Sequence, residues 1–583
     1  MTGSKRVVNP AACLLLTGLM LAMSQVIPAQ VDLRYGQNES VTWQEAIGMY
    51  QWLDEQYREA MLLDAGWSDA GKPLHLFVIS KDGVFSPEAM REEGKNILFI
   101  NNGIHPGEPC GVDASILLAE GLLSGTDPYS RYLDNTVVVI VPLFNIGGSL
   151  NRSPYNRANQ NGPAEQGFRG NARNLDLNRD FIKLDSWNAR SLVELLREWD
   201  PEIFVDTHTS DGADYPYTIT LINSHLQRHE PVQAAFMEQT FLPFLFDAMK
   251  KSPYSMSPYV WSYKSTPENG IVGFMDYPRY TSGYASMFNT MAFTIETHMF
   301  KPFPDRVRST RALLREMLKF SSLHREEIRK VREEAWEQRL NKETFVLRWS
   351  LDTTRHSMLP FEGYRAKTRT SAVTGFPRLY YDRNDPWEAD IPYYRYFTPE
   401  VTVQAPEYYY IPAAWREVIE RLWLNRVEME ELAYDTVMEL EVYYIDEYTT
   451  GREPYNGHYW HSGTTVRKVK EQVKLHAGDL VIPVRQPAIE YLVQALEPEG
   501  YDSFFSWNFF DEILSRQEYF SPYIFEETAE RLLKTDPGLA EAFRAKRSED
   551  SLFRADPYAQ LRFIYEHSPW AEKSYRRYPV YRQ

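Results

Sequence analysis

This chain of 583 residues has little cysteine and no excess of positive charge. Its only cysteines are Cys13 and Cys110. Two cysteines exclude a fold that is built on a framework of disulfides. The formal net charge is −17 at pH 7. A protein that binds the phosphate backbone of nucleic acids needs a basic surface, so we expect no nucleic-acid partner.

Long apolar runs are also rare, and the clearest one lies near the start of the chain. Lys5 and Arg6 precede an apolar run from Ala11 to Met23, and small or turn-forming residues follow it. This order is typical of a secretory signal peptide, and the run is shorter than the roughly 20 residues of a membrane span. We therefore expect a signal peptide over residues 1–30, a periplasmic or secreted protein, and no stable membrane span after cleavage. The alternative is an uncleaved N-terminal anchor.

The hydropathy pattern divides the remaining chain into two parts. From about residue 40 to 300, apolar strand patterns such as 97–104 and 136–144 alternate with helical patterns, of which 41–62 is the first. This alternation predicts an α/β fold with a largely parallel sheet between helices. A charged helical pattern over 304–340 marks the end of this first domain. Beyond it, residues 343–411 are rich in Tyr and Pro and predict short strands and turns, so we expect a C-terminal accessory region of mixed α/β structure over 341–583, of unknown role.

The first chemical signal is His105-Pro106-Gly107-Glu108, which directly follows the apolar run ILFINNGI. A His and a carboxylate three residues apart can reach one cation from a tight turn. This pattern alone is weak, and a second match, His324 with Glu327, lies in the charged helical segment and is interpreted as a solvated helix face. The first match is favoured because ligand sites in open α/β sheets lie beyond the carboxyl ends of strands.

A third ligand candidate, His208, follows the strand pattern EIFVDT. Together His105, Glu108 and His208 form a His₂Glu set, the ligand class of catalytic zinc that leaves one position open to water. We therefore expect one Zn²⁺ per chain. Two other histidine pairs, 225 with 229 and 458 with 461, have no carboxylate at a matching strand end and are weaker candidates.

For hydrolysis, a zinc ion with an open coordination position needs a general base and a group that stabilises the charge that develops on the substrate. Glu296 ends the apolar strand pattern AFTIE. A carboxylate at a strand end gains nothing from burial unless it has a partner or a chemical role. The segment 168–181, FRGNARNLDLNRDF, holds three arginines and several amides in one predicted loop. Such a loop suits recognition of a carboxylate or an oxyanion, although by itself a solvated basic loop would be the simpler interpretation.

The order HPGE, RGNARNLDLNRDF, DTHTSDG and TIE resembles the M14-type zinc carboxypeptidases over about residues 95–300. The resemblance implies a mixed eight-stranded sheet between helices and a peptide substrate with a free carboxylate. It assigns zinc binding to the His₂Glu set, and it makes Glu296 the residue that activates the zinc-bound water and then protonates the leaving amine.

The same resemblance implies roles for residues of the arginine-rich loop. Arg169 would polarise the scissile carbonyl and stabilise its oxyanion, while Asn178 and Arg179 would hold the terminal carboxylate of the substrate. Asp176 would orient the first zinc histidine. The tyrosine of the substrate pocket is not fixed by a clean pattern, and Tyr280 and Tyr277 are the preferred candidates.

Three readings of the function remain open at this point. The leading one is an exported zinc carboxypeptidase. A carboxylate-binding Asn178-Arg179 pair also suits a zinc-dependent deacylase of N-acyl amino acids or a cell-wall peptide amidase. A catalytically inactive, carboxypeptidase-like binding module is the third.

Overall fold

The computed structural model describes residues 30–583, so the predicted signal peptide and Cys13 lie outside the described residues. The chain forms two compact units. The first contains the chain up to Asn341 together with Ser350–Thr398, and the second contains Lys342–Trp349 and Pro399–Gln583. The division therefore differs from the expected boundary at residue 340, because a later segment returns to the first unit.

The first unit is built on an eight-stranded sheet with the strand order β1-β2-β4-β3-β5-β9-β6-β7. Its central strands β4, β3, β5 and β9 are parallel, and β6 pairs in parallel with β7, whereas the pairs β1–β2, β2–β4 and β6–β9 are antiparallel. The predicted mixed eight-stranded α/β fold is thereby confirmed. The strands are β1 (Ala60–Trp67), β2 (Pro73–Ile79), β3 (Asn96–Asn102), β4 (Thr136–Val141), β5 (Ile203–Ser210), β6 (Ile219–Asn223), β7 (Met256–Pro258) and β9 (Met291–His298).

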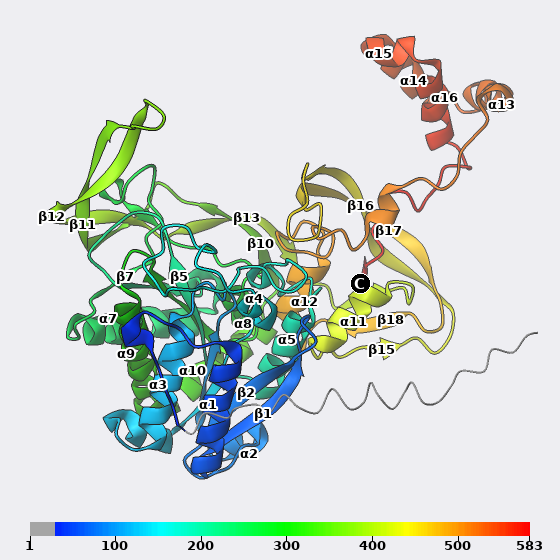
Figure 1. Cartoon of the computed structure of the whole chain (residues 1–583). Coiled ribbons are helices and arrows are strands. Elements are labelled where there is room, and N and C mark those ends of the chain that lie inside the picture. Colours follow the sequence, from blue (N-terminus) through cyan, green and yellow to red (C-terminus); the bar gives the residue numbers. More distant parts are fainter. Residues whose placement is uncertain (1–29) are drawn as a thin grey trace, which may run out of the picture. The chain divides into compact units, whose positions relative to one another are not determined.

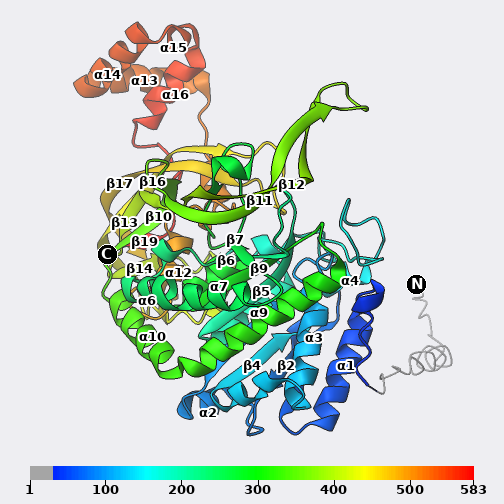
Figure 2. The same ribbon diagram turned by 90° about the vertical axis from the view of Figure 1, so that its left-hand side faces the viewer.

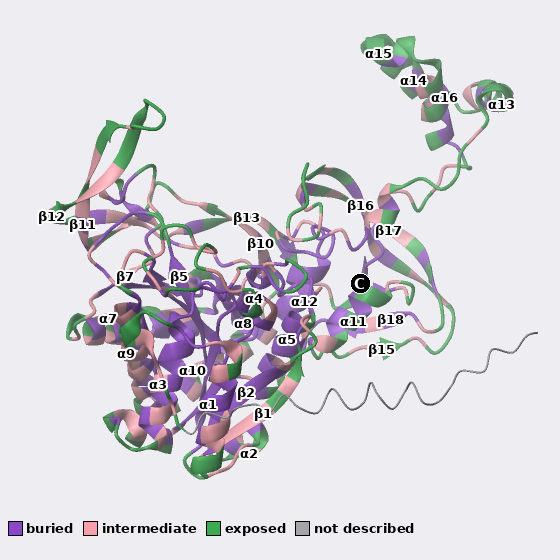
Figure 3. Cartoon of the chain, in the orientation of Figure 1, coloured by how far each residue is buried: buried purple, intermediate pink, exposed green. Residues whose placement is uncertain are grey.

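Helices cover both faces of this sheet, with α3 and α9 on one side and α5 and α8 on the other (Figures 1 and 2). All residues of β3, β4 and β5 are buried, as expected for strands covered on both faces (Figure 3). The helices of this unit are α1 (Trp43–Gln56), α2 (Pro87–Glu92), α3 (Cys110–Leu123), α4 (Ile146–Leu150), α5 (Trp187–Trp199), α6 (Pro231–Phe236), α7 (Leu242–Lys250), α8 (Thr281–Ser286), α9 (Phe303–Leu323) and α10 (Arg325–Leu340).

Two predicted elements differ in extent from the structure. The helical pattern over 41–62 contains a helix and the start of a strand: α1 begins at Trp43, where Thr42 and Glu45 form a capping box, ends at Gln56, and is followed by β1. The apolar residues of β1 continue the helical pattern in sequence, but they pair with β2. The charged helical segment over 304–340 is two helices, which meet at His324.

The Tyr- and Pro-rich segment forms a long hairpin in place of the expected short strands. Strands β11 (Ser357–Thr370) and β12 (Pro377–Tyr394) pair antiparallel along their whole length. The base of β12 pairs in parallel with β8 (Ile271–Val272), which explains why this segment belongs to the first unit. Tyr and Thr favour extended structure, so the composition indicated strands but gave no measure of their length.

The second unit contains a six-stranded sheet of order β15-β18-β14-β19-β16-β17 and a two-stranded sheet of β10 with β13. Helices α13 to α16 form a small cluster with its own apolar core. The expected mixed α/β structure of the C-terminal region is confirmed. Its elements are β10 (Thr344–Leu351), β13 (Phe397–Gln404), β14 (Tyr408–Ile411), α11 (Arg416–Leu424), β15 (Glu430–Glu431), β16 (Thr436–Thr450), β17 (His461–Leu475), β18 (Leu480–Pro483), α12 (Ile489–Leu496), α13 (Pro522–Thr535), α14 (Pro537–Glu549), α15 (Ser551–Ala555), α16 (Pro557–Glu566) and β19 (Tyr581–Arg582). Over residues 30–583, no helix combines the length and the apolar character that crossing a bilayer requires.

One buried carboxyl group predicts how stability depends on pH. Asp113 of α3 is fully buried, and burial raises its pKa to about 8. Since the pKa in the unfolded chain is close to 4, the folded state binds the proton more tightly between these values, and stability falls as pH rises through this window. We expect Asp113→Asn to unfold at a higher denaturant concentration than the wild type at pH 8 and at a similar one at pH 4. Equal shifts at both pH values would contradict this assignment.

Candidate metal centre and active site

The predicted site residues converge at the carboxyl ends of three adjacent parallel strands. A tight turn after β3 carries His105 and Glu108, in which the Glu108 amide donates to the His105 carbonyl at 2.9 Å. His208 lies near the end of β5, and the strand register places it directly opposite Glu296 of β9. The order of β3, β5 and β9 in the sheet therefore brings together residues that are far apart in the sequence.

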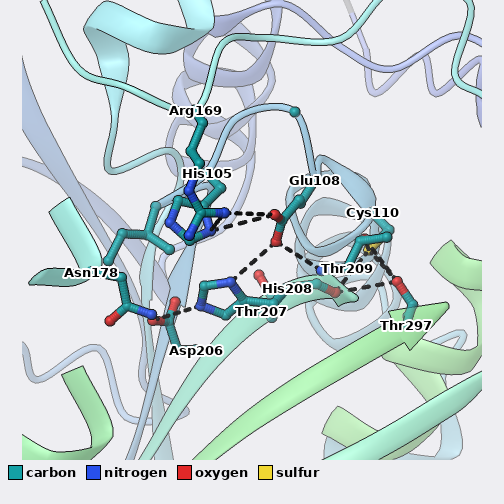
Figure 4. Close-up of polar contacts among 12 residues, drawn as sticks. His105, Glu108, Cys110, Arg169, Asn178, Asp206, Thr207, His208, Thr209 and Thr297 are labelled. Atoms are coloured by element: carbon teal, nitrogen blue, oxygen red, sulfur yellow. Dashed lines mark hydrogen bonds and ion pairs between the residues drawn. The ribbon is translucent and has the colours of Figure 1, made fainter. Parts of the chain in front are cut away.

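His105, Glu108 and His208 are buried and form the one group of metal-ligand type found among residues 30–583, with ligand atoms within 4.8 Å of one another. The Nδ1 atoms of His105 and His208 lie 3.4 and 3.1 Å from the two carboxylate oxygens of Glu108 (Figure 4). Two imidazole nitrogens and a carboxylate facing one point match the His₂Glu set of catalytic zinc. The residues present thus fit a zinc ion.

Carboxylates hold the far side of both imidazole rings. Asp176 Oδ1 lies 2.9 Å from His105 Nε2, and Asp206 Oδ2 lies 3.1 Å from His208 Nε2. A carboxylate on Nε2 keeps a proton there and leaves the Nδ1 lone pair available for a metal. Although burial opposes ionisation, His105 and Arg169 hold the pKa of Asp176 well below its usual range.

Asp206 was not singled out from the sequence, although a signal for it exists. It precedes His208 by two residues in β5, so the two side chains share one face of the strand. The Thr281 hydroxyl and the Asn101 amide donate to its carboxylate at 2.7 and 3.1 Å. Asp206 is fully buried, and its alternation with His208 in DTH is the pattern that could have identified it.

Arg157 is a second residue that sequence reasoning missed. Its guanidinium donates to Glu108 Oε1 at 2.9 Å and to the Thr209 carbonyl at 3.0 Å. Burial opposes ionisation of Glu108, but Arg157 and the two histidines hold the pKa of this carboxyl well below its usual value. Arg157 comes from the irregular segment between α4 and the arginine-rich loop, and nothing in its local sequence distinguishes it.

Glu296 faces the same space as the His₂Glu set. Its Oε2 atom is buried and has no hydrogen-bond partner among the described residues. Burial and the charge of Glu108 raise the pKa of Glu296 to about 8. A carboxyl group with an unused oxygen beside a metal centre is available to exchange a proton with a bound molecule.

The arginine-rich loop supplies the other predicted residues. The Arg169 guanidinium lies 3.2 Å from His105 Nδ1 and 2.9 Å from Asp176, so it borders the metal position. The Asn178 side chain accepts the Thr281 amide at 3.1 Å, and Arg179 packs its guanidinium 4.6 Å from the ring centre of Tyr280. Asp176 caps the short turn Leu177–Arg179, which fixes where Asn178 and Arg179 lie.

These residues line one cavity of about 330 Å³. Arg169, Asn178, Arg179, Glu296 and the His₂Glu set are among its lining residues, as is Tyr280. Tyr277, the other tyrosine candidate, is not. One wall is aromatic and consists of the predicted Tyr280 together with Tyr259, Trp261 and Phe274, which sequence reasoning had not indicated.

The weaker metal candidates have other partners. His229 contacts Ser224 and Gln233, and His461 contacts Asp511 and Thr450. His324 pairs with Glu327 at the junction of α9 and α10. Cys110 is buried beside Thr297 and is not part of the ligand group.

Residues 49–292 match the sequence model of the zinc carboxypeptidase family. This part of the chain belongs to that family. The matched segment contains the His₂Glu set and the arginine-rich loop, and it ends just before Glu296. The recognition made from the four sequence motifs is thereby confirmed.

Relatives of known identity are carboxypeptidases as well. The chain is 21% identical to carboxypeptidase 2 of Trichophyton equinum and 20% identical to that of Trichophyton rubrum, in both cases over 425 residues, which are 70% of this chain and 73% of the relative. Among solved structures, a metallo-carboxypeptidase of Pseudomonas aeruginosa in complex with (2-guanidinoethylmercapto)succinic acid is 16% identical with a TM-score of 0.37, covering 50% of this chain and 71% of the other. Carboxypeptidase A of Helicoverpa armigera is 14% identical with a TM-score of 0.37, covering 57% and 81%.

Proposed function

We propose that the protein is an exported zinc carboxypeptidase that hydrolyses the C-terminal peptide bond of peptides. Membership of the zinc carboxypeptidase family and the convergent His₂Glu set support this proposal. Export rests on the signal-peptide pattern of residues 1–30.

In this proposal His105, Glu108 and His208 hold one zinc ion. The bound zinc would supply Lewis acidity and lower the pKa of a water in the open position. Asp176 and Asp206 keep the imidazole rings oriented by binding their Nε2 atoms. Arg157 holds the Glu108 carboxylate and so fixes the third ligand.

The remaining roles belong to side chains that line the cavity. Glu296 takes a proton from the attacking water and returns it to the leaving amine, for which its unpaired Oε2 is placed. Arg169 stabilises the oxyanion as charge develops on the carbonyl oxygen. Arg179 and Asn178 bind the terminal carboxylate of the substrate, since an Arg fork pairs with a carboxylate through two hydrogen bonds. The aromatic wall favours apolar or aromatic C-terminal residues.

The single observation that carries the proposal is the register of β5 and β9. It places Glu296 beside His208, so that a general base and the metal ligands face one cavity. A binding module without catalysis would have no need of an unpaired carboxyl oxygen at this point.

A peptide panel with and without a chelator tests the function. We expect release of the C-terminal residue from peptides with a free carboxylate, and at least about a tenfold lower kcat/KM for the same peptides with an amidated C-terminus, because Arg179 then loses its charged partner. Removal of metal by dialysis against a chelator is expected to abolish release, and added zinc to restore it. Equal cleavage of the amidated peptides would contradict the proposed carboxylate site, and cleavage of acyl-amino acids alone would favour a deacylase.

The contact between Arg157 and Glu108 predicts an effect on zinc affinity. Replacing Arg157 by Ala is expected to weaken zinc binding about 10–100-fold, as is usual when a group that orients a metal ligand is lost. Arg157→Lys keeps the charge but cannot contact both Glu108 and the Thr209 carbonyl in the same way, so its zinc affinity is expected to lie between those of the wild type and Arg157→Ala. Chelator competition measures the affinity directly. Arg152→Ala is the matched control, because Arg152 lies in the same segment but binds the backbone of Ser40 and Val41. Unchanged zinc affinity in Arg157→Ala would show that Arg157 does not position Glu108.

A further inference from the structure

The base of the β11–β12 hairpin is firmly fixed to the first unit. Phe361, Trp387 and Ile391 share an apolar cluster with Tyr215 and Tyr217 of the loop after β5. In addition, Arg383 donates to Asp214 at 2.6 Å, and the Tyr217 hydroxyl accepts the Glu362 amide at 2.9 Å. The outer half of the hairpin projects away from this base and is largely exposed (Figures 1, 2 and 3). The hairpin is therefore an anchored projection of the first unit.

The end of this hairpin, residues 369–379 and here called the hairpin tip, presents apolar side chains to solvent. Val373 is 94% exposed, Phe376 73% and Leu379 45%. Hydrogen bonds close the turn: the Ser371 carbonyl accepts the Gly375 amide at 2.9 Å, and the Ser371 hydroxyl accepts the Val373 amide at 3.2 Å. The fold thus holds apolar side chains outward at the point most remote from the hairpin base, where they stabilise nothing within the unit.

The charge of the hairpin tip is opposite to that of the chain. Residues 365–380 contain Arg365, Lys367, Arg369 and Arg378 and no Asp or Glu, in a chain of net charge −17. Lys367 pairs with Asp382 and Arg365 lies near Glu268. Over the described part of the chain, Arg369 and Arg378 form no ion pair.

The strand register adds a specific feature to this charge. Arg369 and Arg378 are direct cross-strand partners. Like charges in directly opposed positions destabilise a strand pair. The Arg369 guanidinium lies 5.0 Å from the centre of the Tyr380 ring, but among the described residues no carboxylate neutralises either arginine at this level of the hairpin. An anion bound between the two guanidinium groups would remove the repulsion.

We propose that the hairpin tip docks on an anionic phospholipid surface. Val373 and Phe376 enter the boundary between headgroups and acyl chains, and Arg369 and Arg378, one step behind them, bind lipid phosphates. A soluble polyanion would satisfy the arginines but would leave the apolar pair in water, which is why the lipid surface is the better match. The hairpin base contacts the loop between β5 and β6, and Ser210 at the end of β5 and Asp211 at the start of this loop line the cavity, so the docked hairpin and the cavity belong to the same unit. This inference does not depend on the proposed catalytic activity.

Vesicle binding by the full chain tests the proposal. We expect co-sedimentation with vesicles of phosphatidylcholine mixed with phosphatidylglycerol and much weaker binding to phosphatidylcholine alone. The double variants Val373→Ser with Phe376→Ser and Arg369→Gln with Arg378→Gln are each expected to lose about tenfold or more in vesicle affinity, because docking uses both an apolar insertion and a charge contact. Circular dichroism and thermal unfolding of these variants check that they are folded.

The β16–β17 hairpin offers matched controls in Val437→Ser and Arg467→Gln, because Val437 is 60% exposed and Arg467 lies on the paired strand. These are expected to bind vesicles as the wild type does. Insertion is read directly from Phe376→Trp, whose fluorescence should shift to the blue with phosphatidylglycerol vesicles. Absence of binding by the wild type overturns the proposal. So does loss of binding in the arginine variants alone, which would indicate a soluble polyanion, and so does a self-association that the tip variants abolish, which would indicate a second copy as the occupant.

Discussion

Replacement of Glu296 by Gln is expected to lower kcat for peptide hydrolysis by about 10²–10⁴-fold, the range typical for loss of a general base. Gln keeps the size of the side chain but cannot accept the proton of the attacking water. Glu296 is not a member of the His₂Glu group, so the zinc content of the variant is expected to equal that of the wild type. Steady-state kinetics together with metal analysis separate the two effects.

Two comparisons make this result interpretable. Asp211→Asn removes a negative charge from the lining of the same cavity and is expected to change kcat less than tenfold, because Asp211 is exposed and does not face His208 in the sheet. His208→Ala is expected to lose both zinc and activity. If Glu296→Gln kept zinc and full activity, the assignment of Glu296 as general base would be wrong.

The site could be anticipated to this extent because its chemistry lies at strand ends. His105, Glu108, His208 and Glu296 each follow or end an apolar strand pattern, and parallel strands bring their carboxyl ends to one edge of a sheet. The local pattern could not predict the order of the strands in the sheet. The resemblance to a known family supplied that order.

Other residues could not be found in this way, for physical reasons. Arg157 reaches Glu108 from an irregular segment whose path depends on tertiary packing, and the aromatic wall combines residues of separate loops. The hairpin was missed as a unit because Tyr and Thr indicate extended structure without fixing its register or length. In each case the local sequence indicates only the secondary-structure propensity of a segment. Which residues come into contact depends on the pairing of segments that are far apart in the sequence.

Arg169 is expected to show the second large effect. Its guanidinium borders the metal position, 3.6 Å from Glu108 Oε1 and 3.2 Å from His105 Nδ1, where the oxyanion of a substrate carbonyl would form. Loss of one oxyanion donor usually costs about 10²–10³-fold in kcat. We expect a loss of this size in Arg169→Ala, with a much smaller change in KM, since the contact is made chiefly in the transition state.

Arg169 also binds Asp176, so a purely structural role must be distinguished from catalysis. If Arg169 only held Asp176 against His105, its loss would weaken zinc binding, and saturating zinc would restore kcat. If it stabilises the oxyanion, kcat stays low at saturating zinc, and Arg169→Lys recovers part of the rate because a cation remains near the carbonyl oxygen. Arg173→Ala is the matched control, because Arg173 lies in the same loop but donates to the Asp185 carbonyl on its exposed side. If saturating zinc alone restored the wild-type kcat in Arg169→Ala, the role of Arg169 would be to support zinc binding. Arg169 would then not stabilise the oxyanion.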